Sequence, residues 1–284
     1  MTDSKKLAQP FFKWVGGKRQ IADIILDEFP PEIENYYEPF VGGGAMLFRV
    51  LQEYPNLKHV HINDSNPDVT WANAYVRDAI DKLIDALKVI EEEYNSSEDK
   101  QGFYYKRRTE FNELIREDDY NLRRTVLFLF LNKTCFNGMY RVNRHGNFNT
   151  PYNYAKEVKF DYENLRVCSN LLQKVTITCG DYSYALPNEP AVVYLDPPYR
   201  PLNGGAEIGY TATGFNDEEQ VRLRDNINKM KSTCKVILSN SDTKDRFFDN
   251  LYKGYNIQRI QARRNINRDG NGRGKIDELL IKNF

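Results

Sequence analysis

The tetrapeptide Asp196-Pro197-Pro198-Tyr199 combines residue types that can orient an aromatic amine for nucleophilic attack. Such an amine is a poor nucleophile, because its lone pair is delocalised into the ring. An ionised Asp196 only accepts hydrogen bonds, so it can hold one N–H, and the rigid prolines leave the Pro197 carbonyl to hold the other. Tyr199 offers a flat face on which a base can stack. An ordinary turn at a strand end has a similar composition, so the neighbouring motifs must decide between the two interpretations.

A glycine-rich stretch, residues 38–44, follows the first expected strand, and Asp64 ends the next one. Glycine lets a ligand approach the backbone closely, and Phe40 in the same stretch is a further candidate cofactor contact. The G-x-G-x-x-G fingerprint of dinucleotide sites is absent, whereas a carboxylate such as Asp64 can bind both hydroxyls of a ribose. This pairing favours a nucleoside without a pyrophosphate, such as S-adenosylmethionine. Asp181, at the end of a later strand, is a candidate contact of the cofactor adenine or an ordinary turn residue.

The segment Lys13-Trp14-Val15-Gly16-Gly17-Lys18 precedes the first expected helix. Trp14 can stack on an adenosyl surface, and Lys18 can reach the carboxylate of the methionine part of the cofactor. A buried Trp and a solvated Lys would fit the segment equally well if it stood alone.

Residues 136–151, called the hairpin below, combine aromatic, Met, Asn, Gly and Arg residues. Chemistry on a base requires the base to leave the stack, and an inserted Phe136 or Met139 can fill the gap left behind. Arg141 can read guanine O6 and N7 in a bidentate contact. A solvated turn with Phe148 packed beneath it is the alternative interpretation.

The net charge is zero, with 40 basic and 40 acidic residues, but the charges are segregated. Residues 120–156 contain no Asp or Glu, and their basic residues are Arg123, Arg124, Lys133, Arg141, Arg144 and Lys156. A second basic stretch covers residues 259–275. Such segregation allows local binding of phosphates by a neutral molecule.

Strand-like and helix-like runs alternate, which predicts an α/β fold with an open, mainly parallel sheet of Rossmann type. The expected strands cover residues 36–40, 59–64, 176–181, 191–198, 235–241, 255–260 and 277–283, and the last is expected to insert antiparallel. The expected helices between them cover residues 18–29, 44–54, 162–173, 217–231 and 243–253, with Asn216 and Glu219 capping the fourth. The mostly helical stretch 68–158 is predicted to be an inserted domain, which leaves 1–67 and 159–284 as the catalytic domain.

Composition excludes several other classes of protein. The longest apolar run, residues 126–131, is far too short to span a membrane. The four cysteines form no CxxC pair and the three histidines have no ligand spacing, so no metal site is expected. These features predict a cytoplasmic protein without a membrane partner.

Together the motifs resemble the Dam-type (DpnM-like) family of site-specific DNA adenine-N6 methyltransferases, alpha class. The resemblance covers nearly the whole chain, through KWVGGK, EPFVGGGA, IND, FNGMYRVNRHGNFNTP, DPPY, LSNS and RGKIDELLI in the order of the family. It implies an S-adenosylmethionine methyltransferase fold with a seven-stranded sheet and a target-recognition insert. It also implies that Asp196 to Tyr199 bind an extruded adenine. The implied cofactor site is lined by Trp14, Lys18, Asp64 and Asp196, with Glu38, Gly42 and Asp181 nearby.

The resemblance further implies how duplex DNA would be bound. An aromatic residue at Phe136, a wedge at Met139, a guanine-reading Arg141 and a supporting Pro151 match the hairpin of the family, and Lys13 matches a residue that contacts the target guanine. The candidate DNA-binding set is completed by Arg124, Lys133, Asn137 and Asn143. The expected recognition sequence is GATC, although Phe at 136 and Met at 139 replace the Tyr and Leu of the family.

Direct in-line methyl transfer by a monomer, with a loop at residues 203–215 closing over the base, completes the prediction. Two alternatives stay open at this point. One is a methyltransferase acting on RNA or on a protein amide, and the other is a DNA-binding homologue without catalytic activity.

Overall fold

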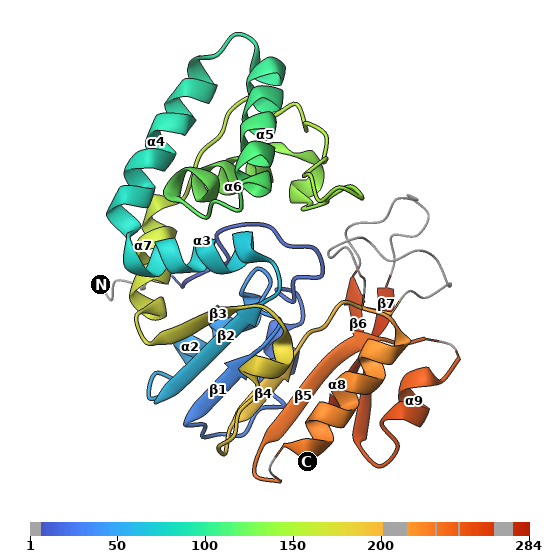
Figure 1. Cartoon of the computed structure of the whole chain (residues 1–284). Coiled ribbons are helices and arrows are strands. Elements are labelled where there is room, and N and C mark those ends of the chain that lie inside the picture. Colours follow the sequence, from blue (N-terminus) through green and yellow to red (C-terminus); the bar gives the residue numbers. More distant parts are fainter. Residues whose placement is uncertain (1–6, 201–214, 231, 244, 264–274) are drawn as a thin grey trace.

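A single seven-stranded sheet forms the centre of the molecule (Figure 1). The computed structural model describes residues 7–200, 215–230, 232–243, 245–263 and 275–284. The strands are β1 (Asn35–Glu38), β2 (His59–Asp64), β3 (Val175–Cys179), β4 (Val192–Leu195), β5 (Lys235–Ser241), β6 (Asn256–Arg263) and β7 (Lys275–Lys282). They lie side by side in the order β3-β2-β1-β4-β5-β7-β6. β7 is antiparallel to β5 and β6, and the remaining pairs are parallel. The predicted α/β class and the antiparallel last strand are therefore confirmed.

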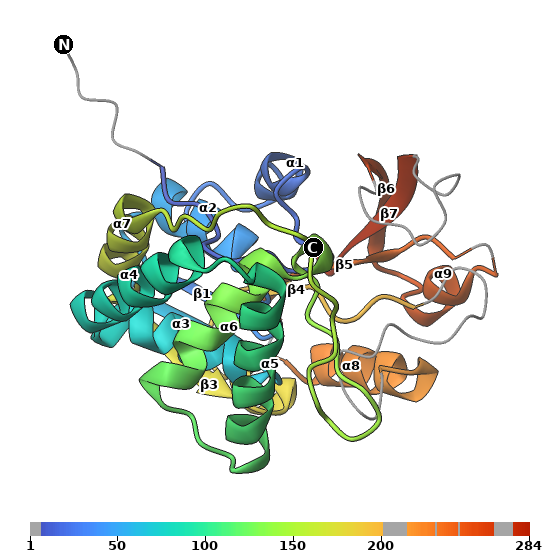
Figure 2. The same ribbon diagram turned by 90° about the horizontal axis from the view of Figure 1, so that it is seen from above.

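Helices flank this sheet on both faces, as the alternation of elements predicts. Seen from above, α1 and α2 lie on one face and α8 on the other (Figure 2). These helices and their companions are α1 (Ala22–Leu26), α2 (Ala45–Glu53), α7 (Tyr162–Leu172), α8 (Asp217–Lys229) and α9 (Phe247–Leu251). α1 and α9 are shorter than predicted. The Asn216 side chain accepts a hydrogen bond from the Glu219 amide (3.0 Å), which confirms the predicted cap of α8.

The stretch between β2 and α7 is mostly helical, as predicted. It contains α3 (Pro67–Asp78), α4 (Ile80–Ser96), α5 (Lys100–Arg116), α6 (Leu122–Thr134) and the 3-10 turn η1 (Phe136–Gly138). α6 packs against α3, α4 and α5, and ten of its thirteen residues are buried. One hydrophobic cluster joins this helix to the sheet through Phe12, Phe48 and Phe128. The domain boundaries near 68 and 158 stay a prediction.

The hairpin is held by two isolated bridges, Cys135 with Tyr152 and Val142 with Phe148. The hairpin lies beside α5 and α6, on their side toward α8 (Figures 1 and 2). The loop predicted at 203–215 falls almost entirely, and the basic stretch 259–275 largely, outside the described residues. In the part of the chain that the structure describes, no helix is long and apolar enough to cross a membrane.

Candidate active site

The predicted functional carboxylates meet at one edge of the sheet. β1 lies between β2 and β4 and is parallel to both, so the carboxyl ends of the three strands are neighbours (Figure 1). Glu38, Asp64 and Asp196 stand at or just beyond these ends. Ligands of open α/β sheets bind at this edge.

Asp64 connects the glycine-rich loop to the start of α3. One carboxylate oxygen accepts a hydrogen bond from the Gly42 amide (2.9 Å), and the other accepts one from the Asn66 amide (2.9 Å). Burial raises the pKa of Asp64 to about 6 although these bonds oppose the shift. A carboxylate has further lone pairs, so Asp64 can still accept hydrogen bonds from ribose hydroxyls.

The glycines of the loop make room for Trp14. A Cβ atom on Gly42 would lie 2.7 Å from the indole Cδ1, and one on Gly43 would lie 3.1 Å from the Trp14 Cβ. Gly42 also has a φ of +48°, which disfavours larger residues. The sequence predicts that a ligand approaches the glycines closely, and in the structure the Trp14 indole ring approaches Gly42 in this way. Trp14 thereby becomes one wall of the loop.

Lys18 and Asp196 form an ion pair that the sequence did not indicate. Lys18 is only 4% exposed, and its Nζ lies 2.8 Å from Asp196 Oδ2. The same Nζ donates to the Gly16 carbonyl (2.6 Å) and lies 4.6 Å from the centre of the Tyr199 ring. Lys18 was predicted to reach the cofactor carboxylate; the structure places its ammonium group against the tetrapeptide.

The second oxygen of Asp196 is an open acceptor. Asp196 Oδ1 is buried and has no hydrogen-bond donor among the described residues. Burial raises the pKa of Asp196 to about 6, while the Lys18 charge opposes the shift. A buried acceptor without a partner costs free energy, and a ligand N–H would remove that cost.

Two further carboxyl groups surround the pair. Glu38 is 2% exposed and accepts a hydrogen bond from the Tyr36 hydroxyl (2.8 Å), and burial raises its pKa well above the usual range. Glu278 of β7 accepts a hydrogen bond from the Tyr199 hydroxyl (2.9 Å), which fixes the ring that would stack on a base. Among the described residues, no three His, Cys, Asp or Glu side chains are grouped as metal ligands.

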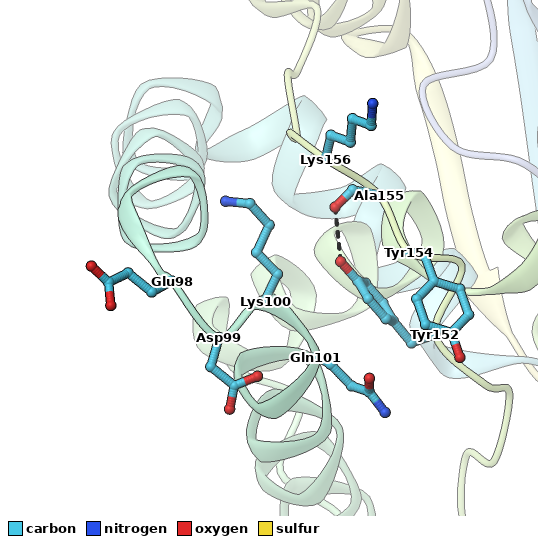
Figure 3. A pocket seen from close by; sticks show the side chains of 8 residues that line it. All are labelled: Glu98, Asp99, Lys100, Gln101, Tyr152, Tyr154, Ala155 and Lys156. Atoms are coloured by element: carbon cyan, nitrogen blue, oxygen red, sulfur yellow. Dashed lines mark hydrogen bonds between the residues drawn. The ribbon is translucent and has the colours of Figure 1, made fainter.

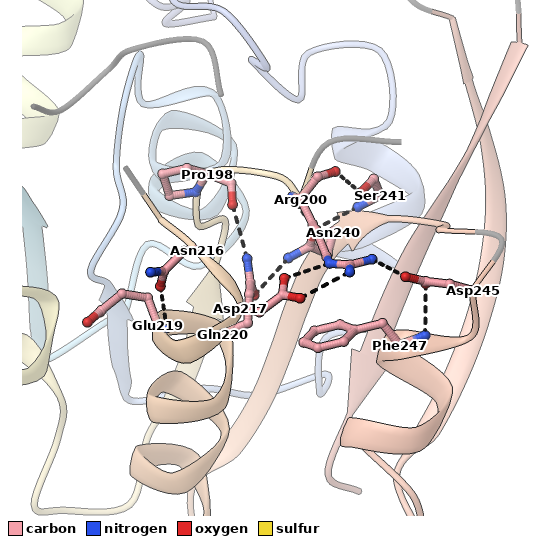
Figure 4. Close-up of polar contacts among 10 residues, drawn as sticks. All are labelled: Pro198, Arg200, Asn216, Asp217, Glu219, Gln220, Asn240, Ser241, Asp245 and Phe247. Carbon is pink, nitrogen blue, oxygen red and sulfur yellow. Dashed lines mark hydrogen bonds and ion pairs between the residues drawn. The ribbon is translucent and has the colours of Figure 1, made fainter. Parts of the chain in front are cut away.

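Buried amides hold the tetrapeptide from behind (Figure 4). The Gln220 side chain donates to the Pro198 carbonyl (3.2 Å) and accepts from the Asn240 side chain (3.2 Å). The Ser241 hydroxyl donates to the Arg200 carbonyl (2.8 Å). Asn240 and Ser241 belong to the LSNS motif at the end of β5, so this motif supports the turn after β4.

Asp181 lies at the same edge, but Arg222 occupies its carboxylate. The Arg222 guanidinium donates to both oxygens, at 2.9 and 2.7 Å, and it lowers the pKa of Asp181 to about 2. Phe40 lies nearby, with its ring centre 5.0 Å from that of Tyr182. The cofactor contacts of Asp181 and Phe40 stay predictions.

Most of the predicted DNA-binding residues are accessible. Phe136 is 51% exposed, and the other exposed members are Lys13, Asn137, Arg141 and Pro151, with Met139 partly buried. The Arg141 Nε donates to the Asn149 side chain (2.7 Å), which orients the guanidinium. The Asn143 side-chain oxygen accepts from the His145 and Asn147 amides, so it also shapes the turn.

The prediction for Arg124 is wrong. Arg124 is 4% exposed, and its Nε donates to Asp68 Oδ1 (2.7 Å) inside the helical stretch. A guanidinium that is enclosed in this way cannot reach a phosphate. Lys133 is partly buried beside the Phe160 ring, and its pKa is lowered first by burial and then by the neighbouring Lys13.

Sequence reasoning missed Asn132, which joins three segments of the site. Its side chain accepts from the Lys13 amide (2.8 Å) and donates to the carbonyls of Lys13 (2.8 Å) and Gly138 (3.0 Å). It thereby ties α6 to the N-terminal segment and to η1. An Asn directly after the apolar run 126–131 was a usable signal, because a buried amide must have partners.

Comparisons with known proteins show the family of the chain. A family model described as D12 class N6 adenine-specific DNA methyltransferase matches residues 14–266. The chain is 44% identical to the type II methyltransferase M.MjaIII of Methanocaldococcus jannaschii, over 97% of this chain and 99% of that protein. It is 34% identical to the type II methyltransferase M1.LlaDCHI of Lactococcus lactis subsp. cremoris (97% and 95% covered) and 31% identical to the DNA adenine methylase of Haemophilus influenzae (96% and 92%). The chain therefore belongs to the D12 class of N6 adenine-specific DNA methyltransferases.

Proposed function

We propose that this enzyme transfers a methyl group from S-adenosylmethionine to N6 of an adenine that has been flipped out of duplex DNA, within the sequence GATC. The observation that carries the proposal is the difference between the two carboxylate oxygens of Asp196. One of its oxygens is held by Lys18, and the other is buried without a donor among the described residues. That second oxygen suits an N6–H.

The residues of the tetrapeptide would orient the amine. Asp196 Oδ1 accepts one N6–H, the Pro197 carbonyl accepts the other, and the Tyr199 ring stacks on the base. These bonds draw the nitrogen toward a tetrahedral geometry. S-adenosylmethionine, when bound, supplies an electrophilic methyl group on its sulfonium sulfur. Asp196 can also take up the N6 proton that must leave, and no covalent enzyme intermediate is needed.

The cofactor side of the site fits a nucleoside. Asp64 offers carboxylate lone pairs for ribose hydroxyls, and Trp14 offers an indole wall beside Gly42. Asp64 is the last residue of β2, and Trp14 packs against Gly42 beyond the end of β1, so both lie at the same edge of the sheet as Asp196, which follows β4. We place the reaction in the cytoplasm and assign it to a monomer.

The hairpin would supply the DNA contacts. Phe136 is exposed and can occupy the gap left by the flipped base, with Met139 beside it. Arg141 is exposed and oriented by Asn149, which suits a bidentate contact with guanine. The choice of GATC rests on the likeness of this hairpin to that of the Dam-type family.

Replacing Asp196 with Ala tests the proposal. We expect methyl transfer to a GATC duplex to fall by at least about 10²- to 10³-fold, which is the typical cost of removing one preorganised hydrogen-bonding group that stabilises a transition state. Duplex affinity, measured by fluorescence anisotropy, is expected to stay within about twofold. Asp78→Ala is the matched control, since Asp78 is exposed and pairs with Arg77 away from the site. An active Asp196→Ala protein would refute the assignment.

A second experiment tests the substrate and the recognition sequence. Transfer to duplex DNA, RNA and peptide substrates is compared, and modified adenines are mapped after expression in a host without adenine methylation. We expect methylation of duplex DNA at GATC. Transfer to RNA or to a peptide amide instead, or methylation at another sequence, would replace the corresponding part of the proposal.

A further inference from the structure

Tyr140 belongs to the hairpin but faces the interior of the molecule. It lies between Met139 and Arg141, the predicted wedge and the predicted guanine reader, yet it is only 7% exposed. Its ring centre lies 5.7 Å from that of Trp14 and 5.6 Å from that of Phe148. Tyr140, the residue between the predicted wedge and the predicted guanine reader, therefore packs against Trp14, which forms one wall of the glycine-rich loop at residues 38–44.

The hydroxyl group of Tyr140 has a buried anionic partner. It donates to Asp68 Oδ2 (2.9 Å), while the other oxygen of Asp68 accepts from Arg124 Nε (2.7 Å). Asp68 and Arg124 are 3% and 4% exposed. Two donors on one buried carboxylate fix its position, and Asp68 in turn fixes Tyr140.

Asp68 is also connected to Asp64, the carboxylate that we propose for ribose binding. The Asp68 amide donates to the Asn66 side chain (2.9 Å), and the Asn66 amide donates to Asp64 (2.9 Å). The other oxygen of Asp64 accepts from the Gly42 amide, next to Trp14. Tyr140 thus reaches Asp64 by two routes, through its hydroxyl and through its ring.

We propose that Tyr140 is a positioning residue that couples occupancy of the cofactor site to the placement of Met139 and Arg141 on DNA. A ligand that fixes Trp14 and Asp64 also fixes the two contacts of Tyr140, and the hairpin is then held in its reading position. By linkage, DNA raises the affinity for the cofactor by the same factor as the cofactor raises the affinity for DNA. This inference rests on the proposed function, since it requires both ligands to bind.

Tyr140→Phe tests the hydroxyl contact. The affinity for a GATC duplex and for a scrambled duplex is measured with and without S-adenosylhomocysteine. For each duplex, the affinity with this ligand divided by the affinity without it is the coupling factor. Coupling between sites typically amounts to roughly 5- to 150-fold. We expect such a factor for the unaltered protein on GATC. In Tyr140→Phe we expect it to fall toward one, with the affinity for S-adenosylhomocysteine alone changed less than about twofold.

Tyr152→Phe is the matched control (Figure 3). Tyr152 is also 7% exposed, but its hydroxyl donates to the Ala155 carbonyl (2.8 Å) and contacts Tyr94, so it makes no bond to Asp68 or Asp64. We expect this variant to keep the coupling factor. An unchanged factor in Tyr140→Phe, or an equal loss in Tyr152→Phe, would overturn the inference.

A measurement on the unaltered protein covers the case in which Tyr140→Phe does not fold. Hydrogen exchange of amides in residues 136–151 is followed with and without S-adenosylhomocysteine, in the absence of DNA. We expect the ligand to slow exchange in the hairpin, and no change would contradict the inference. If neither S-adenosylhomocysteine nor the duplex binds, the proposed function fails instead; if both bind without coupling, only this inference fails.

Discussion

At the scale of single residues, the ionisation of Asp196 decides what the site can do. In the proposed mechanism the ionised carboxylate holds N6–H and can take up a proton, whereas the protonated form is a weaker acceptor and cannot take up a further proton. Burial raises the pKa of Asp196 to about 6. Full activity is therefore expected above pH 6, and below it kcat is expected to fall about tenfold per pH unit. The kcat is measured at saturating cofactor, because burial raises the pKa of Asp64 to about 6 as well, and Asp64 is the residue that we propose for ribose binding.

Lys18→Met is expected to shift the fall in kcat at acidic pH, called the acidic limb below, to higher pH. Burial and the nearby Glu278 raise the pKa of Asp196, whereas the charge and hydrogen bond of Lys18 lower it, so without Lys18 only the smaller effect of the Tyr199 hydroxyl opposes the rise. Glu38, Tyr36, Tyr194 and Tyr199 face the same space and provide no compensating cation. Lys18→Arg keeps the charge and is expected to keep the limb near its original position. An unshifted limb in Lys18→Met would show that the ion pair does not control Asp196.

Arg141→Ala is expected to reduce selectivity more than affinity for DNA in general. A bidentate contact with guanine gives about 1–3 kcal/mol of discrimination, or roughly 5- to 150-fold. Methylation rates are compared on GATC duplexes and on duplexes with the guanine replaced. Equal losses on both duplexes would make Arg141 a phosphate contact.

At the scale of elements, α6 shows how neighbouring residues on one helix differ in role. Arg124 is enclosed and paired with Asp68, whereas Arg123 is 36% exposed and pairs with Glu110. Breaking a buried pair typically costs about 3–5 kcal/mol, and an exposed pair contributes about 0–1 kcal/mol. We expect Arg124→Met to lower the free energy of unfolding in urea by the larger amount and Arg123→Met by the smaller. Similar values for both would contradict the burial of Arg124.

The elements themselves were largely predictable, because their patterns are local. Buried apolar runs mark the parallel strands, and a carboxylate after each of two runs, Asp64 and Asp196, marks the functional edge. The face that a helix turns inward was not predictable for α6, since nearly all of it is buried, and this explains the wrong role given to Arg124. The Lys18–Asp196 pair was missed because no local pattern relates residues that lie so far apart in the sequence.

At the scale of the molecule, a chain with no net charge needs a locally basic surface to bind the phosphates of DNA. Burial and then the nearby Lys13 charge lower the pKa of Lys133. Both lysines lie beside the hairpin, because Lys133 shortly precedes it in the sequence and the Lys13 side chain packs against Gly138. We expect Lys133→Gln to weaken binding equally on GATC and scrambled duplexes. The slope of log K against log salt concentration should become shallower by about 1.

Lys58→Gln is the control for this measurement. Lys58 immediately precedes β2, so it lies at the opposite edge of the sheet from the site, where it pairs with Glu34. Its replacement is expected to leave the salt slope unchanged. A slope that changes equally in both variants would mean that the binding surface is not confined to the hairpin side.

Asp196 Oδ1, which has no donor among the described residues, also limits which bases the enzyme would bind. An ionised carboxylate repels a carbonyl oxygen, so hypoxanthine, which carries an oxo group where adenine carries its amine, would meet lone pairs instead of a proton. The same filter would admit cytosine, whose ring also bears an amine. Discrimination between adenine and cytosine would therefore have to come from the size of the ring that stacks on Tyr199 and from the DNA contacts that we propose for the hairpin.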